Sequence, residues 1–483
     1  MKPFKILLFV FAIIIVLGFV MLIFPKDGIK VNNDLTIKFT SFQELFFQKK
    51  VEYADISDLL NLGLFNLDSL DLSGDSDSAK VDTFRVSADS LKQVVYKLQF
   101  ADSNKTALHP FFKKLKNRTE VIHVMHYGDS QIEGDRITGI IRNHLQSRYG
   151  GYGIGVIPAV EINNVSVSIT QSASDNWQRY TVFGKKDTTI KHNRFGALGV
   201  YCRYAPVWND SLPNDSVNYE GWLKFEKSNI TFASNKKFKN IKLFYGYNQK
   251  PVIAELYVGE EMKQFHTLMS GKSIKVQNFI VENTPDEFKI KFTGKDSPDI
   301  YGISIESDAG ILVDNIAMRG SAGLDFTRMN MTQQSQMYRL LNTNLLILQF
   351  GLNVVPNVVE DYTYYENWFY NQLSALKRFN PDMSIIVIGV SDMSRKKGEY
   401  YESYPNIEKI RDVQRNAAFK ANCAFWDFYE AMGGENSMPS WVFAEPPLAT
   451  KDFTHLNYKG ARIIGQMFYN ALIYEQNSYN KKH

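Results

Sequence analysis

The chain has 483 residues, more than an average domain needs, so two globular units are expected. Hydrophobic residues make up 44% of it and aromatic residues 14%, which is enough for a sizeable core. The net charge is only +4, and no basic tract with interleaved aromatics occurs, which argues against a nucleic-acid partner. Cys202 and Cys423 lie too far apart for a zinc motif or a disulfide framework and are expected to be buried small hydrophobes.

The N-terminal segment, residues 1–27, has the features of a membrane anchor. Lys2 and Lys5 precede an uninterrupted apolar run over residues 6–24, which is long enough to cross a bilayer. The residues after the run are bulky, so an uncleaved anchor is favoured over a cleaved signal peptide, which would give a secreted protein. The leading lysines favour a cytoplasmic N-terminus and a periplasmic remainder, although Lys26 weakens this bias.

Residues 28–110 are expected to connect this anchor to the globular part. The stretch 68–82 is rich in Asp and Ser and poor in apolar residues, which is typical of a solvated linker. A helix is expected over 87–100.

Residues 111–160 begin an α/β pattern. A short apolar run over 120–128 indicates a buried parallel strand. The stretch 131–150 is expected to be a helix, because its isoleucines and leucine recur at helical spacing and two glycines end it.

The pattern changes to short alternating segments over 161–310, which predicts an inserted all-β sandwich. The expected strands are 165–172, 228–234, 240–247, 252–259, 273–281 and 287–294. Its aromatic side chains could stack on sugars, but packing in the sandwich core is the favoured explanation for most of them. These aromatics are Trp177, Tyr180, Trp208, Tyr219 and Trp222.

The α/β pattern resumes over 311–476. Strands are expected at 343–351, 383–391 and 423–429, and helices at 364–379, 406–422 and 458–476. This alternation predicts a three-layer α/β/α domain with a parallel sheet covered on both faces, made of the discontinuous ranges 111–160 and 311–476.

Four segments lie where ligands bind in open α/β sheets, beyond the carboxyl ends of the strands. They contain Gly128-Asp129-Ser130, "MRGSAG" (318–323), "FGLN" (350–353) and "DFTHLNYKG" (452–460). Acyl transfer needs a hydroxyl, a base, a group that orients the base, and donors for the oxyanion.

Each role has a candidate in these segments. Ser130 offers the hydroxyl, His455 the base, and Asp452 the group that holds the imidazole. The backbone N–H groups of Ser130 and Gly320 and the side chain of Asn353 offer three oxyanion donors, with Gly323 as an alternative to Gly320. Taken singly, each motif also has a structural explanation, and Ser130 could be only a helix N-cap.

This ordered set resembles the SGNH (GDSL-type) hydrolase superfamily over about 111–160 and 311–475. Within it, the export segment, "HYGDS" and the inserted β module resemble periplasmic peptidoglycan O-acetylesterases, and the insert resembles a carbohydrate-binding module. The resemblance implies removal of O-acetyl groups from N-acetylmuramic acid. One departure is Gln131, where such relatives carry His.

Several other residues are expected to have no role in the reaction. Glu133 and Asp135 should lie in a first helical turn, where they complement the helix dipole. His123 and His126 lack a third ligand, so no metal site is indicated, and ester hydrolysis of this kind needs no cofactor. Trp441, Phe443 and residues 445–447 could wall the acyl pocket or simply pack.

The sequence therefore predicts a membrane-anchored serine esterase whose partners are an acetylated glycan, most of all peptidoglycan, and the membrane. Three alternatives stay open: an O-acetyltransferase or acetylxylan-type esterase on another glycan, a glycan-binding protein with an inactive hydrolase domain, and a fatty-acyl lipase.

Overall fold

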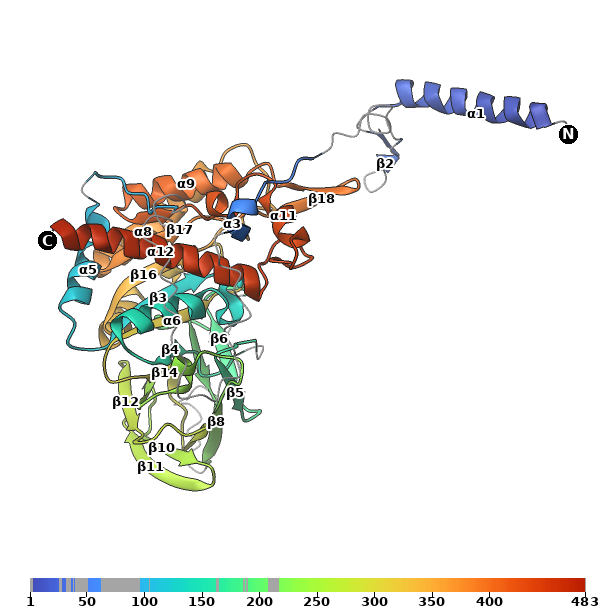
Figure 1. The fold of residues 1–483 in the computed structure, drawn as a ribbon. Helices are drawn as coiled ribbons and strands as arrows, with labels where there is room; N and C mark the ends of the chain where they lie inside the picture. Colours follow the sequence, from blue (N-terminus) through green and yellow to red (C-terminus); the bar gives the residue numbers. More distant parts are fainter. Residues whose placement is uncertain are drawn as a thin grey trace. The chain divides into compact units, whose positions relative to one another are not determined.

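The computed structural model describes residues 3–25, 28–31, 36–37, 39, 51–61, 96–103, 105–161, 165–185, 187, 190–206 and 217–482 (Figure 1). Several expectations lie outside these residues: the linker 68–82, residues 87–95 of the expected helix, and Lys2, Lys26 and Trp208. The chain divides into two compact units, residues 1–52 and 53–483.

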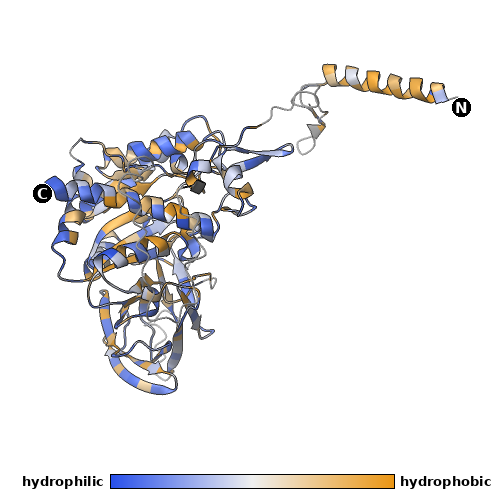
Figure 2. Cartoon of the chain, viewed as in Figure 1, coloured by the Kyte–Doolittle hydropathy of each residue, from blue (hydrophilic) through white to orange (hydrophobic). Residues whose placement is uncertain are grey.

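The first unit contains the helix α1, Pro3–Ile23, which is mostly hydrophobic (Figure 2). None of its residues is buried. It is the one helix among the described residues that is long and apolar enough to cross a membrane. The short strands β1, Ile29–Lys30, and β2, Thr36–Ile37, pair antiparallel in the same unit.

The second unit contains a five-stranded parallel sheet in the order β15-β3-β16-β17-β20. The strands are β3 (Ile122–Gly128), β15 (Ile311–Ala317), β16 (Thr343–Gln349), β17 (Ser384–Ile388) and β20 (Ala424–Trp426). All are buried along their length or nearly so, which explains why the strands other than β15 appear in the sequence as short, largely apolar runs.

Helices cover both faces of this sheet. Successive strand residues point to opposite sides, so each buried strand contributes side chains to a core on either face. Val124, Ile347 and Ile386 face a core formed with α5, α6 and α12, whereas Met125, Leu346 and Val387 face a core that includes residues of α7, α8 and α9. The helices are α5 (His109–Lys116), α6 (Thr138–Tyr149), α7 (Met331–Leu340), α8 (Thr363–Phe379), α9 (Ile407–Lys420) and α12 (Tyr458–Lys482). The expected three-layer α/β/α fold is confirmed.

Most of the stretch between β3 and β15 forms two antiparallel sheets, in the orders β11-β10-β13-β8-β5 and β12-β9-β14-β7-β6. Their strands are β5 (Ile169–Ala173), β6 (Gln178–Thr181), β7 (Val200–Arg203), β8 (Tyr219–Lys227), β9 (Asn240–Gly246), β10 (Val252–Val258), β11 (Glu261–Leu268), β12 (Lys275–Ile280), β13 (Glu287–Gly294) and β14 (Asp299–Glu306). This is the expected additional β module.

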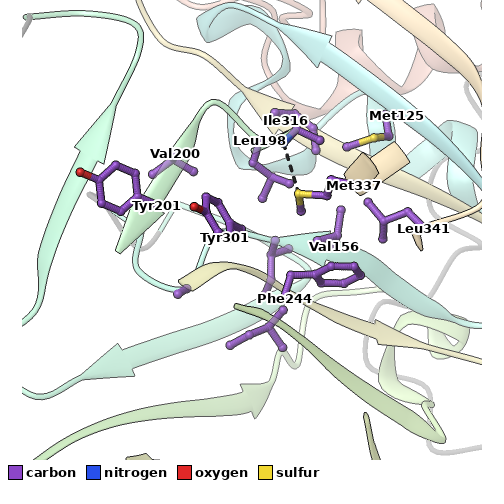
Figure 3. Close-up of a cluster of buried hydrophobic side chains, with 14 of the residues drawn as sticks. Met125, Val156, Leu198, Val200, Tyr201, Phe244, Tyr301, Ile316, Met337 and Leu341 are labelled. Carbon is purple, nitrogen blue, oxygen red and sulfur yellow. Dashed lines mark hydrogen bonds between the residues drawn. The ribbon is translucent and has the colours of Figure 1, made fainter. Parts of the chain in front are cut away.

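The β module shares a hydrophobic core with the parallel sheet. Met125 and Ile316 of the parallel sheet lie in one buried cluster with Val156, Phe244 and other residues of the antiparallel sheets (Figure 3). Strand β4, Gly153–Ile157, precedes residue 160 and yet pairs with β14. The domain boundaries at 160 and 310 therefore stay predictions.

Four sequence-based elements differ from the structure. Residues 96–100, the described end of the helix expected over 87–100, are not helical, and Gln99 forms a β-bridge there instead. The stretch 131–150 is a 3₁₀ turn, η3 (Ser130–Asp135), followed by α6, because Glu133 and Gly134 have non-helical backbones. The expected strand 228–234 is absent: its residues form turns and lead into the 3₁₀ helix η4, Ala233–Lys236, where the Thr231 hydroxyl accepts a 2.8 Å hydrogen bond from the Asn235 side chain. Strand β20 ends early, because Asp427 caps the helix α10, Phe428–Met432.

Part of the expected linker packs on the α/β core. Ile56, Leu59 and Leu98 are buried there, and α3 spans Ser57–Asn61. Gln99 forms an antiparallel bridge with Phe425. Residues 96–103, which we call the arm, therefore cover the outer edge of β20. The described remainder comprises η2 (Thr106–Leu108), η5 (Phe326–Arg328), the hairpin β18 (Ser394–Lys397) and β19 (Tyr400–Ser403), and α11 (Ser437–Phe443).

Candidate active site

The turn after β3 presents Ser130. A Cβ atom on Gly128 would lie 2.8 Å from the carbonyl oxygen of Gln349, so only glycine fits where β3 passes β16. The buried carboxylate of Asp129 accepts the backbone N–H of Gln131 at 3.0 Å and that of Leu352 at 3.3 Å. Asp129 is thus the residue that caps the turn, and the hydroxyl of Ser130 is left for another partner.

That partner is His455, in the loop between α11 and α12. The distance from Ser130 Oγ to His455 Nε2 is 2.8 Å, and His455 Nδ1 lies 2.7 Å from Asp452 Oδ2. The structure therefore brings the predicted hydroxyl, base and orienting carboxylate into one hydrogen-bonded line. This is the geometry that nucleophilic activation of a serine requires.

Asp452 is itself held by its own loop. Its Oδ1 accepts from Thr450 Oγ1 at 2.6 Å and from the backbone N–H groups of Thr454 and His455 at 3.0 Å each. Burial alone would raise the pKa of Asp452, but these hydrogen bonds and the one from His455 outweigh it and lower the pKa to about 2. The carboxylate consequently stays ionised at neutral pH.

Of the predicted oxyanion donors, the Ser130 N–H lies in the turn after β3, and the others lie on the two loops that follow β15 and β16. Gly320 is exposed and has φ +81°, and its N–H has no acceptor among the residues that the structure describes. Gly323 is buried, and its N–H donates to Ser321 Oγ at 3.0 Å. Asn353 is exposed and donates one amide hydrogen to the Ser321 carbonyl at 2.9 Å, which leaves its second hydrogen for a ligand. These contacts favour Gly320 over Gly323.

Gln131, which the sequence marks only as a departure from the family that it resembles, and Arg136, which the sequence does not single out, join the serine turn to the histidine loop. Arg136 donates to the carbonyl oxygens of Ser130 and Leu456 at 2.8 Å each. Gln131 is buried and bonds to the backbone of Thr454 and Leu456. Apart from that departure at Gln131, the one sequence signal for either residue is proximity to Ser130, since their partners in the histidine loop lie more than 300 positions away.

Of the two acidic residues of the turn, Glu133 lies in the first turn of η3, although with a non-helical backbone, and Asp135 does not lie in a first helical turn, contrary to expectation. Asp135 precedes α6 and forms a buried ion pair with Arg142, 2.5 Å between Oδ2 and Nη1. Glu133 faces Arg319, 3.4 Å between Oε1 and Nη1. Their charges are therefore matched by arginines.

Most of the aromatic candidates pack rather than line a site. Trp441 is fully buried and donates to the Met432 carbonyl, whereas Phe443 is 57% exposed and its ring lies 5.6 Å from that of Phe453. Trp177 packs edge-on against Tyr204 of the sandwich core. The remaining aromatics, Tyr180, Tyr219 and Trp222, are half-buried.

The two strand histidines and the two cysteines are all buried. His123 contacts Asp314 and Glu306, and His126 contacts Gln349 and Thr138. Cys202 and Cys423 are unpaired thiols, as expected from their spacing. Within the described ranges, no group of three or more His, Cys, Asp or Glu side chains is arranged to hold a metal ion.

Comparison with known proteins identifies a structural relative. No family model matches the chain, and no curated protein matches it. A solved structure of a peptidoglycan O-acetylesterase superposes with a TM-score of 0.61 at 21% identity, covering 79% of this chain and 99% of that one. The expected resemblance is thus confirmed for the fold.

Two further solved structures match over smaller parts. An acetyl xylan esterase is 16% identical, with a TM-score of 0.26, over 34% of this chain and 81% of its own. A carbohydrate esterase family 3 protein from Talaromyces cellulolyticus is 18% identical, with a TM-score of 0.26, over 34% of this chain and 72% of its own. Scores this low carry no structural inference.

Proposed function

We propose that the chain is a serine esterase that removes O-acetyl groups from a cell-wall glycan, with peptidoglycan as the substrate. The observation that carries this proposal is the hydrogen-bonded line from Ser130 Oγ through His455 to Asp452, at 2.8 and 2.7 Å. The fold likeness to a peptidoglycan O-acetylesterase supports the choice of substrate.

In the proposed acylation step, Ser130 Oγ attacks the acetyl carbonyl carbon while His455 Nε2 takes the hydroxyl proton. Asp452 stabilises the resulting imidazolium. The N–H groups of Ser130 and Gly320 and the amide of Asn353 stabilise the oxyanion.

Acylation is completed when His455 returns the proton to the departing sugar oxygen, which leaves an acetyl group on Ser130. Water then attacks this ester while His455 takes a proton from it, and the acetyl–serine bond breaks as His455 returns that proton to Ser130 Oγ, which releases acetate. The residues supply the nucleophile, the base and the oxyanion donors for both halves.

We also infer that α1 anchors the protein in a membrane with the second unit outside the cytoplasm. Apart from Lys5 the helix is apolar all round, as lipid contact requires. Lys5, near its start, favours this orientation. Alkaline carbonate should leave the full-length chain in the membrane pellet, whereas release into the supernatant would contradict an anchor.

The decisive experiment measures acetate released by the full-length protein from O-acetylated peptidoglycan, with acetylated xylan as comparator. We expect faster release from peptidoglycan, and Ser130→Ala should lower the rate by roughly 10³-fold or more. Ser147→Ala, an exposed helix serine, is the matched control. Unchanged release by Ser130→Ala would refute the assignment of the nucleophile.

The same experiment tests the alternatives. Preference for acetylated xylan would overturn the choice of peptidoglycan but not the esterase proposal. In a parallel reaction with an acetyl donor and a glycan acceptor, acetylation of the acceptor in excess of free acetate would identify a transferase. Preference for long-chain acyl esters would identify a lipase.

A further inference from the structure

The loop that carries His455 is irregular apart from one isolated β-bridge between Ala449 and Leu456, and all six backbone polar groups of residues 454–456 have partners. Backbone N–H and C=O groups outside helices and sheets normally find their hydrogen-bond partners in water or in side chains. Their partners are Asp452 Oδ1 for the N–H groups of Thr454 and His455, Thr450 N–H for the His455 carbonyl, Gln131 for the Thr454 carbonyl and the Leu456 N–H, and Arg136 for the Leu456 carbonyl.

Gln131 supplies two of these six contacts. Its Oε1 accepts the Leu456 N–H at 3.1 Å, and its Nε2 donates to the Thr454 carbonyl at 3.3 Å and to Ser391 Oγ at 3.3 Å. A primary amide offers one acceptor and two donors, so it can bond to both backbone groups that flank His455, as a neighbouring strand would. The side chain is only 2% exposed, so water does not compete.

Gln131 is also the residue directly after Ser130, and the Asp129 cap fixes its backbone N–H. Arg136 completes the connection, because its guanidinium bonds to the Ser130 carbonyl as well as to the Leu456 carbonyl. The same short turn therefore holds the hydroxyl and the backbone on both sides of the imidazole.

From this arrangement we propose that Gln131 is a positioning residue, whose side-chain amide sets the distance between Ser130 Oγ and His455 Nε2 by holding the backbone on both sides of His455. This inference rests on the proposed esterase function. The inference requires the hydrogen-bonding groups of the Gln131 amide, whereas a side chain that only filled buried space would need none.

The test compares the wild type with Gln131→Met. Methionine keeps the length and approximate volume of the side chain but bonds to neither backbone group. We expect kcat for acetate release to fall roughly 10- to 100-fold with KM within about threefold, because a displaced base slows chemistry more than binding. The matched control is Gln372→Met. Gln372 is also buried and bonds to one backbone N–H and one carbonyl, those of Thr327 and Trp368.

A second variant, Gln131→Glu, gives a pH signature. The protonated acid keeps one donor and one acceptor, whereas the ionised form cannot donate to the Thr454 carbonyl. We therefore expect kcat of Gln131→Glu to decline as the pH rises through the pKa of the new carboxyl, a limb that the wild type lacks. A residue that only fills space would give no such limb.

A readout independent of activity separates this inference from the proposed function. Proton NMR should show a downfield resonance for His455 Nδ1–H bonded to Asp452, which Asp452→Asn abolishes, and Gln131→Met should shift or broaden it while Gln372→Met does not. Folded Gln131→Met with kcat within about threefold of wild type would overturn the inference. An unchanged resonance in that variant would overturn it even if the wild type released no acetate.

Discussion

Asp452 serves its loop and the imidazole at once, and both tasks depend on its charge. One oxygen accepts three donors from residues 450–455, and the other accepts the His455 ring. With a pKa of about 2, the carboxylate is ionised throughout the neutral range. A neutral amide at this position would present donors where only acceptors are needed.

Replacement of Asp452 by Asn should therefore lower kcat for acetate release by roughly 10³- to 10⁴-fold, with the fold retained. Steady-state kinetics on acetylated peptidoglycan, with circular dichroism as the check on folding, would measure it. Asp286→Asn, at a position whose side chain is fully exposed, should leave kcat unchanged. A loss smaller than about tenfold would mean that Asp452 does not orient the base.

At the residue scale, the sequence predicts the candidate nucleophile, base and orienting carboxylate from their residue types and their order along the chain. Ser130, Asp452 and His455 are recognisable because each follows a strand or precedes a helix. The capping role of Asp129 was not predicted, because Asp and Ser are equally good caps and only the backbone geometry decides between them. The contacts of Gln131 were not predictable either, since they join residues 325 positions apart.

At the scale of elements, the strands of the parallel sheet that form continuous apolar runs were found, and β15 was missed. Its sequence carries Asp314 and Asn315, which interrupt the pattern although Asp314 is completely buried. Tertiary partners explain this: Asp314 Oδ1 accepts the Val156 N–H at 2.7 Å, and Oδ2 lies 2.9 Å from His123 Nδ1. A pattern of single residues cannot show that a polar side chain will be satisfied in the core.

The arm of residues 96–103 is another element that composition alone did not separate from the linker. Leu98→Ala should lower the free energy of unfolding by about 2–4 kcal/mol, because Leu98 is 3% exposed and its loss leaves a cavity beside β20. Urea denaturation would measure the change. Val358→Ala, at a position that is 47% exposed, should cost less than about 0.5 kcal/mol. Equal costs would show that the arm contributes nothing to stability.

At the scale of the whole molecule, a buried charge network joins the parallel sheet to the β module. His123 of β3 lies between Asp314 of β15 and Glu306 of β14, and Glu306 also pairs with Lys242 of β9. Burial alone would lower the pKa of His123, but the two carboxylates outweigh it and raise the pKa to about 9. The junction is therefore held by charge as well as by the shared apolar core.

This junction makes the stability of the molecule depend on pH. Because the pKa of His123 is higher in the folded state than in the unfolded state, its contribution is complete below about pH 6.5 and is lost as the pH rises through about 9. Relative to His123→Gln, the wild type should lose on the order of 3 kcal/mol of unfolding free energy between pH 6.5 and 9.5. Parallel pH dependence of wild type and variant in urea titrations would contradict this.

The separation of Ser130 and His455 along the chain has a consequence for synthesis. The two residues are 325 positions apart, with the whole β module between them. Ribosomes add roughly 5–20 residues per second, so a nascent chain carries its serine for tens of seconds before its histidine exists. If the proposed function is right, a growing chain thus lacks the base that activates Ser130, and with it the esterase activity, until residue 455 has been translated.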